Sequence, residues 1–166
     1  LDLIKANPMT RALRIDKLTL AALESTLLLH LDEKRAMEEI PTLKMLKLDK
    51  GILKKRARRL VNRLSEMVKK KTKITMREDI SQVGGGALPL QDLPTMVLAI
   101  KPLDFPVNPL EENLRKGEPP IISRISKDEL ILDMRTVLDE EIPILAAGIE
   151  KALTHVAKSK AHSEVT

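Results

Sequence analysis

The sequence contains no cysteine, tryptophan or tyrosine, and Phe105 is its one aromatic residue. Without cysteine, the chain forms no disulfide, offers no thiolate to a metal and has no cysteine nucleophile. Without aromatic side chains, it lacks the platforms on which nucleic-acid bases stack in single-strand and RNA-recognition domains. The core must therefore be built from aliphatic side chains and methionine.

Long apolar runs and targeting signals are also missing. No run of about 18 apolar residues occurs, so no transmembrane helix is expected. The first residues, LDLIKANPMT, lack the apolar stretch and cleavage site of a signal peptide, and a cytoplasmic location is expected. Since the chain starts at Leu1 and not at methionine, we expect it to be a piece of a longer protein. The three histidines have no metal-ligand spacing, and no metal site is expected.

The 166 residues are 43% apolar and 32% charged, which is typical of one globular domain with its own core. Apolar residues recur at helical spacing in several segments. The helix ending at Leu31 is apolar around so much of its surface that we expect it to pack against more than one partner. The expected helices cover residues 16–31, 33–39, 49–70, 109–116 and 139–157, with Asp16, Asp49 and Asp139 as N-caps.

Period-two alternation predicts the strands. They are expected at 74–83, 96–100, 121–125 and 130–134, with a tight turn at 126–129. This order favours an α+β fold with a four-stranded, mainly antiparallel sheet covered by helices on one face. The expected organisation is a connecting segment with a long linker helix (1–31), a small α+β domain (32–157) and a flexible polar tail (158–166).

Basic residues are concentrated in residues 47–73. This stretch holds twelve lysines and arginines and two acids, a net charge of +10 against +5 for the whole chain. Such a concentration favours a polyanion bound through its phosphates, with strong salt dependence and little reading of sequence. A solvated helix face explains the same charges, and the pattern leaves both interpretations open.

Arg11, Arg14 and Lys17 follow one another at three-residue spacing in RALRIDK. Residues three apart on a helical turn lie on the same side, so the two guanidinium groups could converge on one small anion. Planar guanidinium groups suit phosphate-like anions well. The alternative is that they are surface arginines paired with Asp16 or Glu24.

Two further features allow either a purely structural or a functional interpretation. The glycines at 84–86 would let the backbone approach a ligand closely, but a flexible turn explains them too, and the segment is not a P-loop. Arg135 ends the hairpin strand LILDMRTV (130–137). Strand alternation places it opposite the apolar face and predicts an exposed arginine.

Several segments occur in the order found in one family. In combination they resemble bacterial selenocysteine synthase, the L-seryl-tRNA(Sec) selenium transferase family, from about residue 4 to residue 140. Each segment alone would be a weak signal, whereas the combination is specific. The segments are RALRIDKLTLAALESTL (11–27), IPTLKML (40–46), GGGALP (84–89), PIISRI (120–125) and LILDMRTV (130–137).

This resemblance implies the small C-terminal domain of a fold-type-I pyridoxal 5′-phosphate enzyme. The family converts serine esterified to tRNA(Sec) into selenocysteine with selenophosphate, and the cofactor acts as an electron sink. Its cofactor-bearing lysine lies in a KLLGGPQAG stretch upstream of the region matching residue 1, so this segment alone is expected to be inactive. The family also forms homo-oligomers, dimers built into larger rings.

The resemblance carries over to particular residues. In the family the arginines of the RALR motif hold the anionic selenium donor, and Arg11 and Arg14 match those positions. Lys17 matches as well, as a possible substrate-site residue. In related fold-type-I enzymes an arginine near the last strand of the small domain binds a substrate carboxylate. Arg135 sits comparably, although serine esterified to tRNA has no free carboxylate.

Two other functions stay open from the sequence. One is a non-catalytic RNA-binding module that uses the basic helix, where Lys54, Lys55 and Arg58 would carry the binding. The other is a related pyridoxal-phosphate lyase acting on a small amino acid or sugar acid. In such a lyase the RALR segment would hold a different phosphate.

Overall fold

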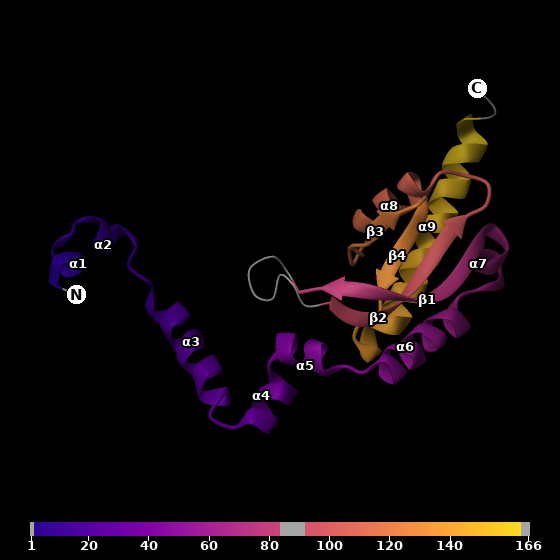
Figure 1. The fold of residues 1–166 in the computed structure, drawn as a ribbon. Coiled ribbons are helices and arrows are strands. Elements are labelled where there is room, and N and C mark those ends of the chain that lie inside the picture. Colours follow the sequence, from indigo (N-terminus) through magenta and orange to yellow (C-terminus); the bar gives the residue numbers. More distant parts are fainter. Residues whose placement is uncertain (1, 84–91, 164–166) are drawn as a thin grey trace. The chain divides into compact units, whose positions relative to one another are not determined.

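The computed structural model describes residues 2–83 and 92–163, and their side chains as far as residue 157. The chain divides into two compact units, Leu1–Lys47 and Leu48–Thr166, each of which is described by itself (Figure 1). The sequence placed this boundary after residue 31. The later division reflects the contacts that the helix Glu33–Glu39 makes with the helix before it and with the helix after it.

The first unit is helical. Asp16 caps α3 as expected, accepting hydrogen bonds from the backbone N–H groups of Leu18 and Thr19. The expected end of α4 before Pro41 is confirmed, but Pro41 also begins a further helix, α5, that the sequence did not predict; proline is well tolerated at a first helical position. Although α3 is strongly apolar, no helix among the described residues is long and apolar enough to cross a bilayer. The elements are α1 (Asp2–Ala6), α2 (Met9–Ala12), α3 (Lys17–Leu29), α4 (Glu33–Glu39) and α5 (Pro41–Lys47).

The second unit confirms the predicted α+β class. Its four strands form one sheet in the order β1-β2-β4-β3, with each neighbouring pair antiparallel. The turn between β3 and β4 is confirmed, since Lys127 and Asp128 both have positive φ (52° and 59°), as in a two-residue type I′ hairpin. The elements are α6 (Lys50–Arg63), α7 (Glu66–Lys71), β1 (Thr72–Gln82), β2 (Asp92–Pro102), α8 (Val107–Arg115), β3 (Arg124–Ser126), β4 (Glu129–Asp133), the 3-10 turn η1 (Asp139–Glu141) and α9 (Ile142–Ser163).

The long helix expected over 49–70 is wrong. Asp49 caps α6 as predicted, but Leu64 and Ser65 take extended backbone with ψ of 133° and 160°. The chain therefore ends α6 and starts α7, and Leu64 and Val68 both enter the core. No glycine or proline occurs at residues 64 and 65, so the sequence contains no local signal for the break. We attribute the break to tertiary packing.

The cap expected for the last helix is also wrong. Asp139 does not cap α9; it lies in η1, and its carboxylate binds side chains of α6. The N–H of Leu138 instead donates to Glu141 Oε2 at 2.8 Å. Helix α9 then continues to Ser163, into the segment expected to be a polar tail.

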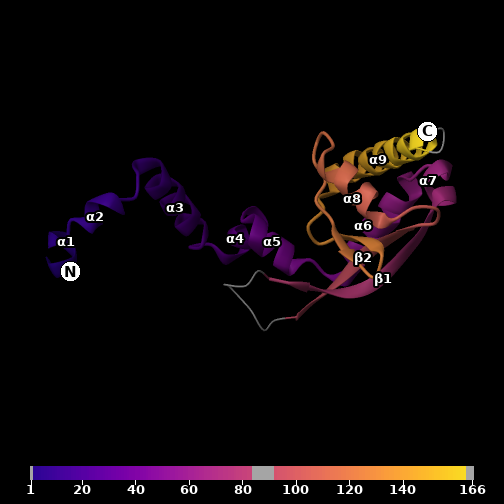
Figure 2. The ribbon, with the colours of Figure 1, turned by 90° about the horizontal axis from the view of Figure 1, so that it is seen from above.

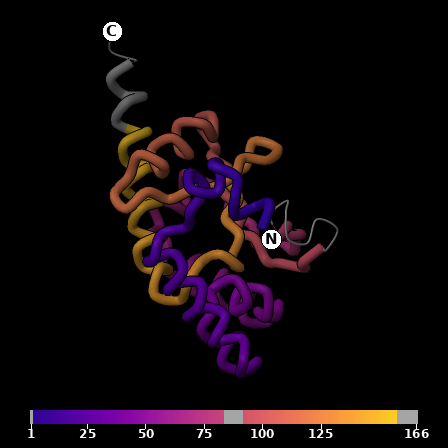
Figure 3. The backbone as a smooth tube through the Cα atoms, turned by 90° about the vertical axis from the view of Figure 1, so that its left-hand side faces the viewer, coloured from indigo at the N-terminus to yellow at the C-terminus, as the bar shows by residue number. Residues whose placement is uncertain are grey.

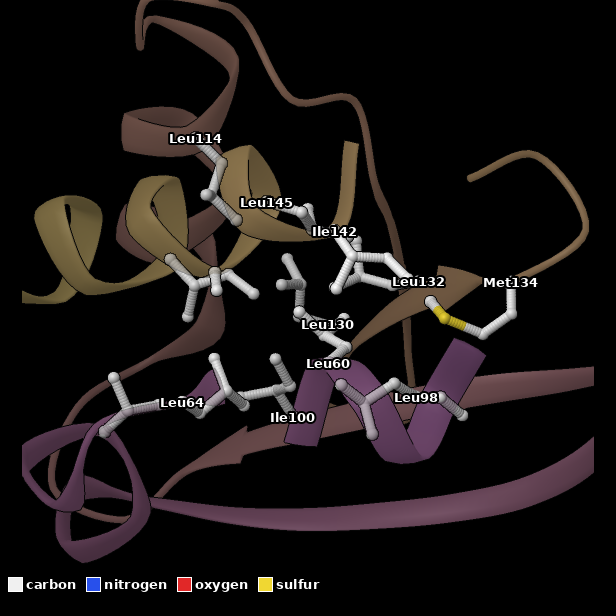
Figure 4. Packing of buried hydrophobic residues seen from close by; sticks show 14 of the residues in the cluster. Leu60, Leu64, Leu98, Ile100, Leu114, Leu130, Leu132, Met134, Ile142 and Leu145 are labelled. Atoms are coloured by element: carbon white, nitrogen blue, oxygen red, sulfur yellow. The ribbon is translucent and has the colours of Figure 1, made fainter. Parts of the chain in front are cut away.

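The core of the second unit lies between its helices and one face of the sheet. Figure 2 shows α6, α8 and α9 on one side of β1 and β2, and Figure 3 traces α8 beside α9. In Figure 4, Leu98 of β2 and Leu130 of β4 point toward Leu60 of α6 and Ile142 of α9, and all four are fully buried. Burial of each such side chain contributes about 1.5–3 kcal/mol relative to exposure. An aliphatic core thus replaces the missing aromatic residues, as the composition predicted.

Candidate functional site

The arginines of the RALR segment do not share a helical turn. Arg11 lies in the last turn of α2, whereas Arg14 follows Leu13, at which the helix has already ended. The three-residue helical spacing expected from the sequence is therefore wrong as a geometric argument. Arg11, Arg14 and Lys17 are all exposed, and none of them forms an ion pair within the described part of the chain.

The carboxylate that could have neutralised these arginines is engaged elsewhere. Asp16 Oδ1 accepts the N–H groups of Leu18 and Thr19 at 2.8 and 3.0 Å, and Oδ2 accepts the Thr19 hydroxyl at 2.6 Å. The Thr19 hydroxyl, followed by its backbone N–H, lowers the pKa of Asp16 below the usual value. Since Asp16 stabilises the start of α3, Arg11 and Arg14 keep exposed guanidinium groups that are available to an anion.

The basic stretch separates into structural and unpaired cations. Arg56 is 7% exposed and both it and Arg59 bind Asp139. Lys50 binds Glu78 at 2.6 Å and, with Lys54, lowers the pKa of that carboxyl. Lys69 binds Glu66 at 2.9 Å. Of the twelve cations counted in the sequence, these four therefore have carboxylate partners inside the second unit.

The outer face of α6 keeps its charge. Leu53, Ala57 and Leu60 form the buried side of the helix. Lys54, Lys55 and Arg58 are exposed and, within the described residues, have no carboxylate partner. Because 54 and 55 lie four and three positions before 58, these cations share one side of the helix. A phosphate backbone could contact this face without displacing an ion pair.

Arg135 is not the exposed arginine that strand alternation predicts. It follows the end of β4 and is 6% exposed. Its Nη1 donates to the carbonyl of Leu48 at 3.1 Å and its Nη2 donates to the carbonyl of Pro94 at 2.8 Å. The correction has a physical reason: β4 ends at Asp133, so the alternation no longer sets the direction of the Arg135 side chain. The glycines at 84–86 lie outside the described residues.

The sheet face away from the helices carries an ion-pair network that sequence reasoning missed. Arg77 of β1 binds Glu129 of β4 at 2.5 Å, and Arg124 of β3 binds Asp79 of β1 at 2.7 Å. Since β2 lies between β1 and β4, these side chains extend over apolar residues that are at most 2% exposed. A sequence pattern that could have predicted this polar face is the alternation of polar residues at 75, 77, 79 and 81. The covered residues are Val97, Ala99 and Ile131.

Comparisons with known proteins identify relatives of one kind. The family model described as L-seryl-tRNA selenium transferase matches residues 1–138. The L-seryl-tRNA(Sec) selenium transferase of Clostridium botulinum strain 657 is 47% identical over 153 residues, which cover 92% of this chain and 33% of the relative. That of Geotalea daltonii is 46% identical over 147 residues, covering 89% and 32%. The chain spans about a third of the length of the curated relatives it matches.

Proposed function

The chain belongs to the L-seryl-tRNA selenium transferase family, and we propose that it is the C-terminal part of an enzyme that converts seryl-tRNA(Sec) to selenocysteinyl-tRNA(Sec) with selenophosphate. The observation that carries this proposal is the 47% identity over 153 residues to a relative of that name. This observation favours a selenium transferase over a related pyridoxal-phosphate lyase. The role of this chain's own residues is to bind the anionic selenium donor.

Pyridoxal 5′-phosphate belongs to the proposal as the group that supplies the electron sink. Each lysine whose side chain the structure describes is exposed or half-buried. None of them offers the enclosed position that a covalently held cofactor requires, so these residues do not fit its attachment. We therefore assign the cofactor's lysine to another part of the complete protein.

Arg11 and Arg14 hold selenophosphate in this proposal. Both side chains are exposed and free of carboxylate partners in the described residues, and Asp16 is engaged in capping α3. A guanidinium group presents paired N–H donors that match two oxygens of a phosphate-like anion. A hydrogen bond to a charged group contributes about 1.5–3 kcal/mol, which corresponds to about 10- to 100-fold in affinity.

Substitution of the two arginines tests this assignment in the complete protein. Arg11→Ala and Arg14→Ala are each expected to weaken selenophosphate binding by about 10- to 100-fold, measured by equilibrium titration. Arg14→Lys is expected to lie between these variants and the wild type, because lysine keeps the charge but loses the planar fork. The cofactor absorbance should not change.

Lys34→Ala is the matched control for this titration. Lys34 is an exposed cation of the same unit and has no ion-pair partner among the described residues. Its removal should leave selenophosphate affinity unchanged, which separates a local effect of Arg11 and Arg14 from a general loss of charge. Wild-type affinity in both arginine-to-alanine variants would contradict the assignment.

The other predictions from the sequence stay predictions. They are the substrate-site roles of Lys17 and Arg135, the ring of homo-oligomeric dimers and the cytoplasmic location. Lys17 is the first residue of α3 and lies directly after its cap. Arg135 is buried, and two of its N–H groups donate to backbone carbonyls.

A second function, binding of the tRNA substrate, has support from one face of α6. Lys54, Lys55 and Arg58 are exposed on the same side of that helix and lack carboxylate partners in the described residues. Such a face would contact phosphates and not bases, since the chain has no Trp or Tyr to stack on them. This role is compatible with the catalytic one, because the proposed substrate is a tRNA.

Charge reversal tests the RNA-binding face. The triple variant K54E/K55E/R58E is expected to abolish tRNA binding by this chain at low salt. The wild type should show a steep salt dependence, with about 0.9 in the slope of log K against log salt for each phosphate contact. The control variant K101E/K127E/K151E changes the charge equally at three exposed lysines elsewhere in the same unit. Equal loss of binding in both variants would reject a defined surface on α6.

A further inference from the structure

Strand β1 lies at one edge of the sheet and is paired on one side only. All eleven of its residues lie opposite residues of β2, from Thr72 with Pro102 to Gln82 with Asp92. Within the described residues, no other strand pairs with its second side. An edge strand presents a row of backbone N–H and C=O groups that can pair with another chain. This edge therefore offers a place at which the sheet can be extended.

Contacts of β2 show which residues of β1 direct their backbone groups outward. The carbonyls of Pro94 and Met96 accept hydrogen bonds from the two residues that follow β4. The even-numbered residues of β2 therefore face β4, and the odd-numbered ones bond to β1, where their partners are also odd-numbered. Even-numbered residues of β1 consequently point away from β2. In agreement, the N–H of Ile80 donates to the Asp79 carboxylate at 2.9 Å.

The open part of this edge is centred on Met76. Ile74, Met76 and Glu78 direct their backbone groups outward, whereas the N–H of Ile80 already has a side-chain acceptor. The side chain of Met76 is 39% exposed, although it lies on the face of the sheet that carries the core. An exposed apolar side chain on an unpaired edge favours pairing with another strand.

A second copy of this chain fits this edge by symmetry and charge. Two identical antiparallel strands related by a twofold axis place one residue opposite its own copy, and every other contact occurs twice. With Met76 on the axis, Lys73 faces Asp79 of the second copy and Ile74 faces Glu78. The two methionines then cover each other, and both lysines gain a carboxylate opposite them.

Other registers are less favourable. An axis at Arg77, Glu78 or Asp79 places that charged residue opposite its own copy, and an axis at Thr75 places Lys73 opposite Arg77. Like charges directly opposite on neighbouring strands are destabilising. An axis nearer either end of β1 shortens the ladder. Charge and ladder length together favour the register centred on Met76.

Lys73 lacks a carboxylate partner within its own copy. It is exposed and lies opposite Lys101 of β2, and neither lysine forms an ion pair within the described part of the chain. Asp79 of a second copy would supply the missing carboxylate while keeping its own ion pair with Arg124. We propose that two copies of this chain join their sheets through β1, as antiparallel strands with Met76 on the twofold axis.

A disulfide at the axis tests this pairing. Met76→Cys introduces a single cysteine, since the sequence has none. In a hydrogen-bonded antiparallel pair the two Cα atoms lie about 5.5 Å apart, which a disulfide can span. Under mild oxidation Met76→Cys is expected to form a covalent dimer of this chain. In the complete protein, mass spectrometry should identify the peptide in which residue 76 is linked to residue 76.

Ile122→Cys and Ile80→Cys are the controls for the disulfide. Ile122 is 70% exposed in the same unit and lies outside β1, so its cysteine reports random collision. Ile80 is 48% exposed on β1 but lies away from the axis. Both variants should stay monomeric under the same oxidation. Equal cross-linking through residues 76 and 122, or no cross-linking through residue 76, would overturn the pairing; cross-linking through residue 80 alone would overturn the register.

Lys73→Glu separates association from folding. It places a carboxylate opposite Asp79 of the second copy and should raise the dissociation constant of the dimer about tenfold or more, measured by sedimentation equilibrium. Within one copy it removes the Lys73–Lys101 opposition, so the free energy of unfolding of the monomer should not fall. Lys127→Glu, in the exposed hairpin turn, should leave dimerisation unchanged.

The pairing does not depend on the proposed function, because none of these measurements involves selenophosphate. A wild-type chain that stays monomeric at every concentration tested would overturn the pairing and leave the roles of Arg11 and Arg14 unaffected. Equal dissociation constants for Lys73→Glu and the wild type would overturn the register centred on Met76.

Discussion

Arg56 of α6 binds Asp139 of η1 across a sequence separation of 83 residues. Arg56 Nη2 lies 3.0 Å from Asp139 Oδ2, and its Nη1 donates to the carbonyl of Val137 at 2.7 Å. Arg59, one turn further along α6, binds the same carboxylate from the surface. The basic helix is therefore attached to the start of α9 by two of its own cations.

Removal of Arg56 should destabilise the chain more than removal of Arg59. Arg56→Leu leaves the Val137 carbonyl and the inner side of Asp139 without a donor and should cost about 1–3 kcal/mol. The side chain of Arg59 is 51% exposed, and Arg59→Leu should cost less than about 1 kcal/mol. Urea unfolding of both variants measures this difference. Equal and small costs would contradict a structural role for Arg56.

Ionised Asp79 should contribute to folding stability, and this contribution should be lost at acidic pH. The N–H of Ile80, and then the charge of Arg124, lower the pKa of Asp79 in the folded state. Because the pKa of Asp79 is lower in the folded than in the unfolded chain, the ionised carboxylate stabilises the fold. This contribution is complete above the unfolded pKa of about 4 and is lost as the pH falls through the folded pKa. Asp79→Asn should therefore flatten the dependence of Tm on pH below about 4.

Asp128→Asn is the control for this acid titration. Asp128 is exposed in the hairpin turn, has positive φ that asparagine also tolerates, and forms no ion pair within the described residues. Its substitution should leave the slope of Tm against pH as in the wild type. A wild-type slope in Asp79→Asn would contradict a stabilisation of the Asp79 carboxylate by the Ile80 N–H and Arg124.

The leucines of α3 should contribute to the stability of the complete protein but not to the stability of this chain alone. None of the residues of α3 is buried here, and Leu23 and Leu27 are 49% and 58% exposed. Leu23→Lys and Leu27→Lys should therefore change the unfolding free energy of this chain by less than about 0.5 kcal/mol. In the complete protein, the same changes should lower Tm by several degrees, because the sequence predicts a second partner for this helix.

Leu60→Ala is the counterpart of these α3 variants. Leu60 is fully buried between α6 and the sheet, and its truncation should cost about 2–5 kcal/mol in this chain. Comparing the unfolding free energies of these variants distinguishes side chains that stabilise this chain from side chains expected to pack only in the complete protein. A cost at Leu27 comparable with that at Leu60, in this chain alone, would contradict the exposure of the α3 leucines.

Local chemistry predicted much of this fold. Asp16 and Asp49 cap helices because a short carboxylate can reach N–H groups two and three residues ahead. Alternating residues predicted β1, β2 and β4, and the tight turn at 126–129 formed as expected. These features depend on neighbours in the sequence, which is why they could be read from it.

Features set by distant contacts could not be predicted in the same way. Asp139 binds Arg56 and does not cap α9, and this partner lies 83 positions away in the sequence. The burial of Arg135 depends on the carbonyls of Leu48 and Pro94. For Arg11 and Arg14, the family motif located the candidate site, whereas the helical-spacing argument was wrong because α2 ends at Ala12.

Turnover by the complete enzyme tests the central claim most directly. The measurement is transfer of radioactive selenium from selenophosphate to tRNA(Sec) charged with serine, by the protein that carries this chain and by its Arg11→Ala/Arg14→Ala variant. The account predicts selenocysteinyl-tRNA(Sec) with the wild type and its loss in the variant, with cofactor absorbance unchanged. Selenium transfer by the variant at the wild-type rate, or no transfer by the cofactor-loaded wild type, would contradict it.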